Sequence, residues 1–364
     1  MPNIKQAFNI YSGRNKYNNY WHSEHCLLRI IQGVTMRRRT FIHSLGAIAG
    51  YGMASKAGLV MANETKLKIK VFPGAQNLPL WAGLENGFFA NAGLNLDVAY
   101  TMNSDELRGD LVSGKVDIAH SAVDNSVAIQ RMTGQPSIIL MGGDSSMNQL
   151  MAQAEIKSIS DLRGKTLIVD APNTAYALQA MKALDVAGIK PGEYKVQVVG
   201  STALRFKAMQ SNKEYSASTL NPPFSIQASD LGLKSLGWLI DLAGPYQASG
   251  MFAMKPFIEA NGQVIEKYIA AWIRSVRWGL NPSNRSTVLA LLEKRLGLSP
   301  DIIEKSYSIL TNPRVGLAVD AQFSMVGFQN LLAIRQEFEK SAPLNPNQFI
   351  DLSYYNRAIA SLKT

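Results

Sequence analysis

The pattern of apolar and polar positions between residues 66 and 232 switches repeatedly between two periods. Short stretches such as KLKIKVF at 66–72 alternate apolar and basic residues, which is typical of a strand with one wetter face. Longer stretches such as 78–93 place Leu80, Leu84 and Phe88 at helical spacing and end at Gly93. The pattern predicts strands at 66–72, 94–100, 116–122, 165–170, 195–200 and 215–220, and helices at 78–93, 103–114, 123–134, 173–188, 201–210 and 221–232.

Strands that alternate with helices of this length predict an α/β fold with parallel strands. After residue 255 the pattern changes to helices joined by short turns, which we expect at 262–279, 284–295, 300–311 and 320–340. Residues 112–125 and 210–223 align at a spacing of 98 residues, each with a polar turn, a short strand and a loop into a helix. This internal similarity favours two similar α/β lobes.

Polar residues before three of the predicted helices indicate how those helices begin. Asn103 stands three residues before Glu106, which is a capping-box arrangement. Asn173 and Asn221 each precede a helix, and Pro222 occupies a first helical position, where its missing N–H does no harm. For each of these asparagines taken singly, a role as helix cap is favoured over a role as ligand donor.

Residues 36–62 have the layout of a cleavable export signal. They begin MRRRTFIHSLGAIAGYG, and the paired arginines before a Phe-Ile pair are similar to a twin-arginine signal. Lys56 interrupts the apolar run well short of the roughly 20 residues that a membrane-spanning helix needs. We therefore expect export by the twin-arginine machinery, with cleavage after Ala62 or, alternatively, after Ala57. No cysteine is near either point, so no lipid anchor is expected.

A signal that starts at Met36 makes residues 1–35 difficult to assign to the folded protein. They show no sustained period of 3.6 or 2. We expect either a misassigned start or a genuine long leader, and neither would contribute to the fold.

The composition changes once residues 1–62 are set aside. The whole chain of 364 residues has a formal net charge of +10, whereas the part after residue 62 carries only +3. That balance gives no argument for nucleic acid or an anionic membrane as a partner. The single cysteine, Cys26, precedes residue 63, and His120 is the one histidine after it. Disulfides, a Cys/His catalytic pair and a multi-histidine metal site are therefore excluded from the later part.

Three segments carry a family resemblance. They are NLPLWAGLENGFFANAGLNLDV at 77–98, LVSGKVDIAHSAVDNSVAI at 111–129 and SISDLRGKTLIVDAPNTAYALQAMKALDVAGIKP at 158–191. These segments resemble periplasmic substrate-binding proteins of ABC importers, in the branch that includes nitrate-, sulfonate- and taurine-binding proteins and thiamine-precursor binders. One departure is that Asn212 to Tyr215 stand where the family often repeats Gly-x-Val-Asp.

The resemblance implies a type II periplasmic-binding-protein fold, with two α/β lobes joined by two hinge crossovers and a helical C-terminal extension. Lobe 1 is expected at 66–154 with 250–364, and lobe 2 at 155–249. The implied function is that of a periplasmic, monomeric protein without cofactor or metal. It would capture a small organic or oxyanion ligand between the lobes and deliver it to an ABC permease. The rival is an exported enzyme related to thiamine-pyrimidine biosynthesis, but such relatives depend on a cysteine-rich motif that is absent here.

Candidate ligand-binding residues lie in four loops that follow strands and open helices, because free N–H groups at helix N-termini point into such a crevice. Asp124 would oppose an anion, although Arg205 and Lys207 on a nearby helix could offset it. A neutral or amine-bearing, partly aromatic ligand therefore suits these residues at least as well as nitrate or a sulfonate. His120 is expected to be neutral at the cleft edge, and Trp81 and Phe224 could equally be core. The predicted set is Gln76, Asn77, Trp81, Ser121, Asp124, Asn125, Asn173, Thr174, Tyr176, Asn221, Phe224 and Tyr246.

Overall fold

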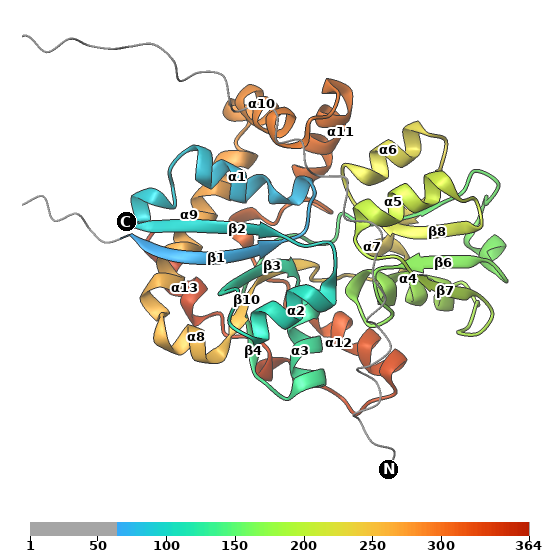
Figure 1. Ribbon diagram of the computed structural model, residues 1–364, viewed down its shortest axis with the longest axis horizontal. Coiled ribbons are helices and arrows are strands. Elements are labelled where there is room, and N and C mark those ends of the chain that lie inside the picture. The colour runs from blue at the N-terminus through green and yellow to red at the C-terminus, as the bar shows by residue number, and fades with distance from the viewer. Residues whose placement is uncertain (1–63, 364) are drawn as a thin grey trace, which may run out of the picture. The chain divides into compact units, whose positions relative to one another are not determined.

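The computed structural model describes residues 64–363, which form two five-stranded mixed sheets (Figure 1). The predicted leader and export signal lie outside the described residues. The first sheet has the order β2-β1-β3-β10-β4, with β1 Thr65–Val71, β2 Leu94–Tyr100, β3 Ile118–Ala122, β4 Ser137–Gly142 and β10 Ser249–Met254. The second has the order β7-β6-β8-β5-β9, with β5 Gln149–Ala152, β6 Thr166–Val169, β7 Lys195–Val198, β8 Tyr215–Leu220 and β9 Lys234–Trp238.

The two sheets have the same strand arrangement. In each, three strands are parallel (β2-β1-β3 and β7-β6-β8), and an antiparallel strand (β10 or β5) pairs with the third of them. The chain leaves the first sheet through residues 143–148 and enters the second as β5, and it returns through residues 243–248 as β10. The repeat seen in the sequence falls on β3 and β8, which hold equivalent positions in the two sheets.

Helices flank both sheets, and the C-terminal helices pack around the first (Figure 1). The helix α9, long and amphipathic, packs against α1 and α13, while α12 packs against α4 beside the second sheet. The helices are α1 Leu78–Glu85, α2 Ser104–Val112, α3 Asp124–Thr133, α4 Ala175–Val186, α5 Thr202–Ser211, α6 Phe224–Asp230, α7 Leu239–Leu242, α8 Lys255–Ala260, α9 Gly262–Leu280, α10 Arg285–Leu296, α11 Pro300–Leu310, α12 Met325–Glu339 and α13 Ser353–Ala360. Short 3-10 helices lie at Ala75–Asn77, Ala90–Ala92, Ile159–Leu162, Pro282–Asn284, Val319–Ala321 and Pro346–Gln348.

The α/β character and the predicted order of elements are confirmed, with differences at three places. The helix predicted at 78–93 ends at Glu85, and the chain turns at Gly87, where φ is 70°, before the 3-10 helix at Ala90–Ala92. The strands β4, β5, β9 and β10 were not predicted, because such short segments give too few positions for a period to show. The lobe boundary at residue 154 is wrong, since β5 pairs with β8 and β9 in the second sheet.

Of the three helix caps predicted from the sequence, Asn103 alone is confirmed. Its side chain accepts hydrogen bonds from the backbone N–H groups of Asp105 and Glu106, at 2.7 and 3.1 Å. The Glu106 carboxylate does not return the bond and accepts from Lys70 at 2.6 Å instead. The predicted caps at Asn173 and Asn221 are wrong, because the N-cap positions are taken by Thr174 and Pro223.

The buried apolar residues form three clusters, and one of them includes residues of both sheets. One apolar cluster joins Val123 of the first lobe, Ala177 of α4 and Phe328 of α12, all buried. The helix α12 therefore packs with both lobes and shields apolar surface of each. Within residues 64–363, no helix has the combination of length and apolarity that crossing a membrane requires.

Candidate functional site

A cavity is lined by loops from both sheets, by the first crossover and by the start of β10. It lies at the carboxyl ends of parallel strands, where β1 and β3 of the first sheet and β6 and β8 of the second lead into helices. All four loops named from the sequence reach it. The predicted residues that line it are Gln76, Asn77, Ser121, Asn125, Thr174, Tyr176 and Asn221.

Hydrogen bonds join the two lobes beside this cavity. Asn221 Nδ2 donates to Gln76 Oε1 at 3.1 Å, and Ser104 Oγ donates to Asp170 Oδ2 at 2.9 Å. The backbone N–H of Ser201 donates to the carbonyl of Met102 at 3.0 Å. These contacts hold loops of one lobe against loops of the other, so the structure is a closed conformation of the two lobes.

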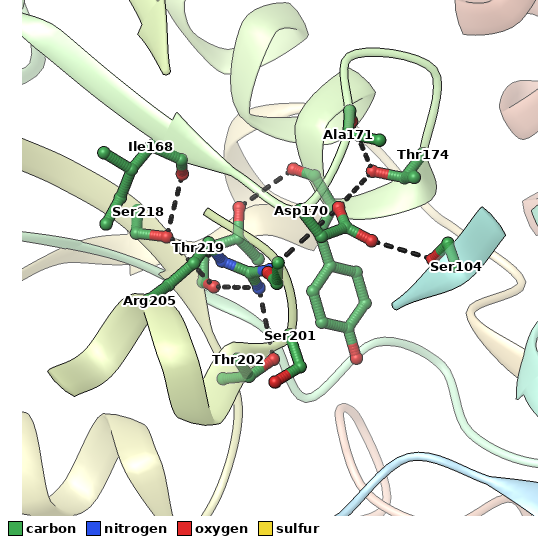
Figure 2. Close-up of polar contacts among 12 residues, drawn as sticks. Ser104, Ile168, Asp170, Ala171, Thr174, Ser201, Thr202, Arg205, Ser218 and Thr219 are labelled. Atoms are coloured by element: carbon green, nitrogen blue, oxygen red, sulfur yellow. Dashed lines mark hydrogen bonds and ion pairs between the residues drawn. The ribbon is translucent and has the colours of Figure 1, made fainter. Parts of the chain in front are cut away.

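A buried guanidinium stands on the second-lobe side of the cavity (Figure 2). The Arg205 side chain is 1% exposed, and burial lowers its pKa from the ordinary value while Asp170 opposes that effect. Its closest approach to the Asp170 carboxylate is 3.9 Å. Most of its N–H groups are used within the lobe, by Ser218 Oγ at 3.0 Å, Gly200 O at 2.6 Å, Thr202 Oγ1 at 3.1 Å and Thr219 O at 2.9 Å.

Asp170 follows β6 and lies between the two lobes. One carboxylate oxygen accepts a hydrogen bond from the Thr174 hydroxyl and the other accepts from Ser104 (Figure 2). Thr174 is the N-cap residue of α4, so the carboxylate sits beside the N-terminus of that helix. A helix N-terminus stabilises negative charge, and here the protein provides that charge itself.

A second carboxylate, Asp144, belongs to the first crossover. The backbone N–H of Ser146 donates to Asp144 Oδ1 at 2.9 Å, and the hydroxyl of Ser249, at the start of β10, donates to Oδ2. Burial raises the pKa of this carboxyl above its ordinary value, against the lowering effect of those hydrogen bonds. In the described part of the chain no basic side chain forms an ion pair with it. Asp144 thus connects the two crossovers and lines the cavity.

Aromatic rings form the first-lobe wall. The His120 ring stacks on Trp272 of α9, with centroids 3.7 Å apart and planes 8° apart. Burial lowers the pKa of His120 to about 3, so the ring is neutral near pH 7, as the sequence analysis expected. Across the cavity, burial raises the pKa of Tyr176, which keeps that phenol neutral as well.

Five predicted residues do not line the cavity, and two of them are held in an ion-pair network. Asp124 is buried and pairs with Arg335 of α12, whose Nε lies 2.5 Å from Asp124 Oδ1. Arg335 neutralises this carboxylate. The expectation that Asp124 opposes an anion in the site is therefore wrong. Asn173 contributes its backbone carbonyl, which accepts from Arg335 at 2.6 Å, while its side chain faces outward.

The other three pack in or against the apolar clusters. Trp81 is 3% exposed and donates through Nε1 to the hydroxyl of Tyr100 at 3.0 Å. Phe224 packs on Phe206, with ring centroids 6.1 Å apart. Tyr246 is buried, which raises its pKa well above the ordinary value. Trp81 is therefore a core residue, whereas Phe224 is partly buried at the edge of an apolar cluster.

Several cavity residues were missed in the sequence, for different reasons. Asp170 ends a predicted strand, so the strand-end rule could have found it. Asp144 follows β4, which the pattern did not predict, and Trp272 lies on a helix far along the chain. Arg205 lines the cavity and Lys207 does not. Among residues 64–363, no group of three His, Cys, Asp or Glu side chains is arranged to hold a metal ion.

The family model described as "NMT1/THI5 like" matches residues 75–284, which is more than half of the chain. The chain belongs to the NMT1/THI5-like family. The matched segment of this family includes most of the cavity, from Gln76 to Trp272.

Comparisons with single proteins agree with this family and show the fold. YtlA of Bacillus subtilis (strain 168), named as a candidate binding protein, is 22% identical over 258 residues, which cover 67% of this chain and 75% of YtlA. The ligand-binding component of an ABC-type import system from Staphylococcus aureus superposes with a TM-score of 0.67 at 15% identity, covering 81% of this chain and 99% of that one. The periplasmic nitrate-binding protein NrtA from Synechocystis PCC 6803 gives 0.69 at 14% identity, covering 82% and 89%. The NMT1/THI5-like chain therefore has the periplasmic-binding-protein fold.

Proposed function

We propose that this protein is an extracytoplasmic solute-binding protein that captures a small molecule between its lobes and delivers it to an ABC import permease. The observation that carries the proposal is the cavity itself, which two loops from each lobe line and which hydrogen bonds between the lobes close. The family membership and the likeness to ligand-binding components of import systems support it.

The two crossovers provide the movement that such a function needs. Only residues 143–148 and 243–248 connect β4 with β5 and α7 with β10. Rotation about them would separate Asn221 from Gln76 and Asp170 from Ser104, which opens the cavity to solvent. A ligand that bridges the same loops would favour the closed arrangement, because it interacts with both lobes only when they are close.

The proposal places the protein in the periplasm as a soluble monomer without lipid anchor. The twin-arginine pattern at residues 36–62 supports export by that machinery. An N-terminus at Asn63 or Gly58 in the exported protein would check this placement, and an N-terminus at Met1 would contradict it.

The first experiment identifies the solute by equilibrium dialysis. Full-length protein is dialysed against a defined mixture of nitrate, alkanesulfonates, taurine, pyrimidines, amino acids and amines, and the retained compounds are identified by mass spectrometry. We expect about one equivalent of one compound class, chemically unchanged. At 100 times its Kd the retained compound should stabilise the fold by about 2.7 kcal/mol, which a thermal unfolding curve detects.

Two matched variants show whether retention uses the cavity. Ala122→Phe places a ring among the lining residues, whereas Ala187→Phe adds the same ring at the exposed end of α4. The first should abolish retention and the second should preserve it. Equal retention by both variants, or no retention by the unmodified protein, contradicts the proposal. Conversion of a compound to a product would favour the exported enzyme instead.

A further inference from the structure

The charged groups that line the cavity are unbalanced. They are Asp144, Asp170 and Arg205, two carboxylates against one guanidinium. His120 does not add positive charge, since its burial keeps the ring neutral near pH 7. The formal charge of the site is negative by one with both carboxyls ionised, and zero if Asp144, whose pKa burial raises, is protonated. In neither state does the site carry a net positive charge that would attract an anion.

The single guanidinium is not presented to a ligand. Arg205 carries five N–H groups, and four of them donate to acceptors of its own lobe. The remaining direction is toward Asp170, 3.9 Å away. An oxyanion would have to displace one of these buried bonds to gain a bidentate contact, and a displaced buried acceptor costs free energy.

One of the helix N-termini at the cavity, that of α4, is also occupied. The carboxylate of Asp170 lies beside the first turn of α4 and accepts from the Thr174 hydroxyl. Helix N-termini favour an anion, but Asp170 already takes that place. A second anion brought to the same turn would meet the Asp170 charge at close range, where repulsion exceeds the attraction of the helix.

The carboxylate itself still has acceptor positions to offer. Ionised carboxylates accept about four hydrogen bonds, and Asp170 receives two, from Thr174 and Ser104. Its side chain is 11% exposed, so few water molecules reach it. The rings of Phe72, Tyr176 and Trp272 line the same cavity and provide apolar surface for the rest of a ligand.

We propose that the ligand is an organic cation, an amine on a compact apolar body, with its ammonium group at Asp170 and its body against the aromatic rings. This inference rests on the proposed function and selects one ligand class for the same cavity. It separates this protein from NrtA, which shares the fold and is a nitrate-binding protein.

Three probes with one body and different head groups test the inference. Isothermal titration of the full-length protein at pH 7 compares 2-phenylethylamine, 2-phenylethanol and 2-phenylethanesulfonate, with nitrate as a fourth probe. We expect the amine to bind at least about tenfold more tightly than the alcohol, and the sulfonate and nitrate to bind more weakly than the alcohol, because the site charge acts on the head group alone.

A variant with a neutral side chain at position 170 tests whether Asp170 is responsible for the preference for the amine. Asp170→Asn keeps the shape of the side chain and can still accept from Ser104, so the ratio of amine affinity to alcohol affinity should fall to about one. Asp97→Asn is the matched control, because Asp97 lies exposed on β2 and pairs with Lys66 at 3.3 Å on the surface. That variant should bind all four probes as the unmodified protein does.

The outcomes separate the two proposals. Tightest binding of the sulfonate or nitrate overturns the cation inference and leaves the solute-binding function in place. An amine advantage that survives in Asp170→Asn also overturns it. If none of the probes binds and dialysis retains no compound, the solute-binding function fails as well.

Discussion

At the scale of single residues, the cavity depends on titratable groups that burial holds in one state. His120 is neutral because protonation would leave a charge without solvent beside Trp272. The Asp144 carboxyl group accepts hydrogen bonds from the Ser146 backbone N–H and from the Ser249 hydroxyl. These side chains keep the hydrogen-bonding pattern of the cavity constant near neutral pH.

The pH dependence of the free energy of unfolding should reflect the titration of His120. The unfolded chain takes up a proton near pH 6.5, whereas the folded protein does so only at about pH 3. The unfolded state therefore binds more protons between these values, so the contribution of His120 is fully present above pH 6.5 and is lost as the pH falls toward 3. The slope for one group is at most about 1.4 kcal/mol per pH unit.

His120→Phe keeps the ring against Trp272 and removes the titration. In urea unfolding at pH 7.5, 6.5, 5.5 and 5.0, the variant should gain stability relative to the unmodified protein as the pH falls. The gain should be up to about 1 kcal/mol between pH 6.5 and 5.5. A difference that stays constant over this range would show that His120 is solvated or protonated in the folded state.

At the scale of elements, the returning strand β10 fits between β3 and β4 because glycine keeps the backbones close. Gly250 lies opposite Gly142 on β4 and Ser121 on β3. A Cβ at Gly250 would lie 2.5 Å from the carbonyl oxygen of Met141 and 2.7 Å from Val123 Cγ1. The backbones of β10 and β4 cannot move apart to make room for this Cβ without disturbing the sheet that positions the cavity loops.

Gly250→Ala should therefore lower the free energy of unfolding by about 1–3 kcal/mol, measured by urea denaturation. Gly109→Ala on α2 is the control, because its added Cβ meets nothing within 4 Å. Alanine in that exposed helix should instead stabilise the protein by about 0.5–1 kcal/mol. The same sign for both variants would contradict the packing argument.

At the scale of the whole described unit, α12 connects the two lobes through one buried arginine. Arg335 pairs with Asp124 of α3 through Nε and donates to the Asn173 carbonyl of the second lobe. Burial opposes its charge, but the pairing with Asp124 outweighs that effect and raises its pKa. Lys182 of α4 and Glu337 of α12 add a partly exposed pair at 2.7 Å, which contributes little by comparison.

Arg335→Met removes the partner of a buried carboxylate and should cost about 3–5 kcal/mol of unfolding free energy. Combining it with Asp124→Asn removes the unpaired charge and should recover a large part of that loss. Urea unfolding of the two single variants and the double variant gives the coupling free energy. A single-variant cost below about 1 kcal/mol, or no recovery in the double variant, would show that the pair is not a buried link between the lobes.

The sequence by itself determined the elements and the positions that follow the strand ends. Local periodicity depends on neighbours a few residues apart, so the longer helices, most strands and the Asn103 cap could be predicted from the chain. Gln76, Ser121 and Thr174 line the cavity for a related reason, because residues in the loop after a parallel strand reach the crevice of an α/β sheet.

Only the tertiary structure decided which charges meet. Asp124 and Arg335 are 211 residues apart, and Ser104 and Asp170 are 66 apart, so no local pattern relates the members of either pair. The sequence therefore assigned Asp124 to the site and overlooked Asp170. A carboxylate after a strand has the same local signature whether an arginine from a distant helix neutralises it or a ligand can reach it. Long-range packing decides between the two, because it determines which groups are buried together.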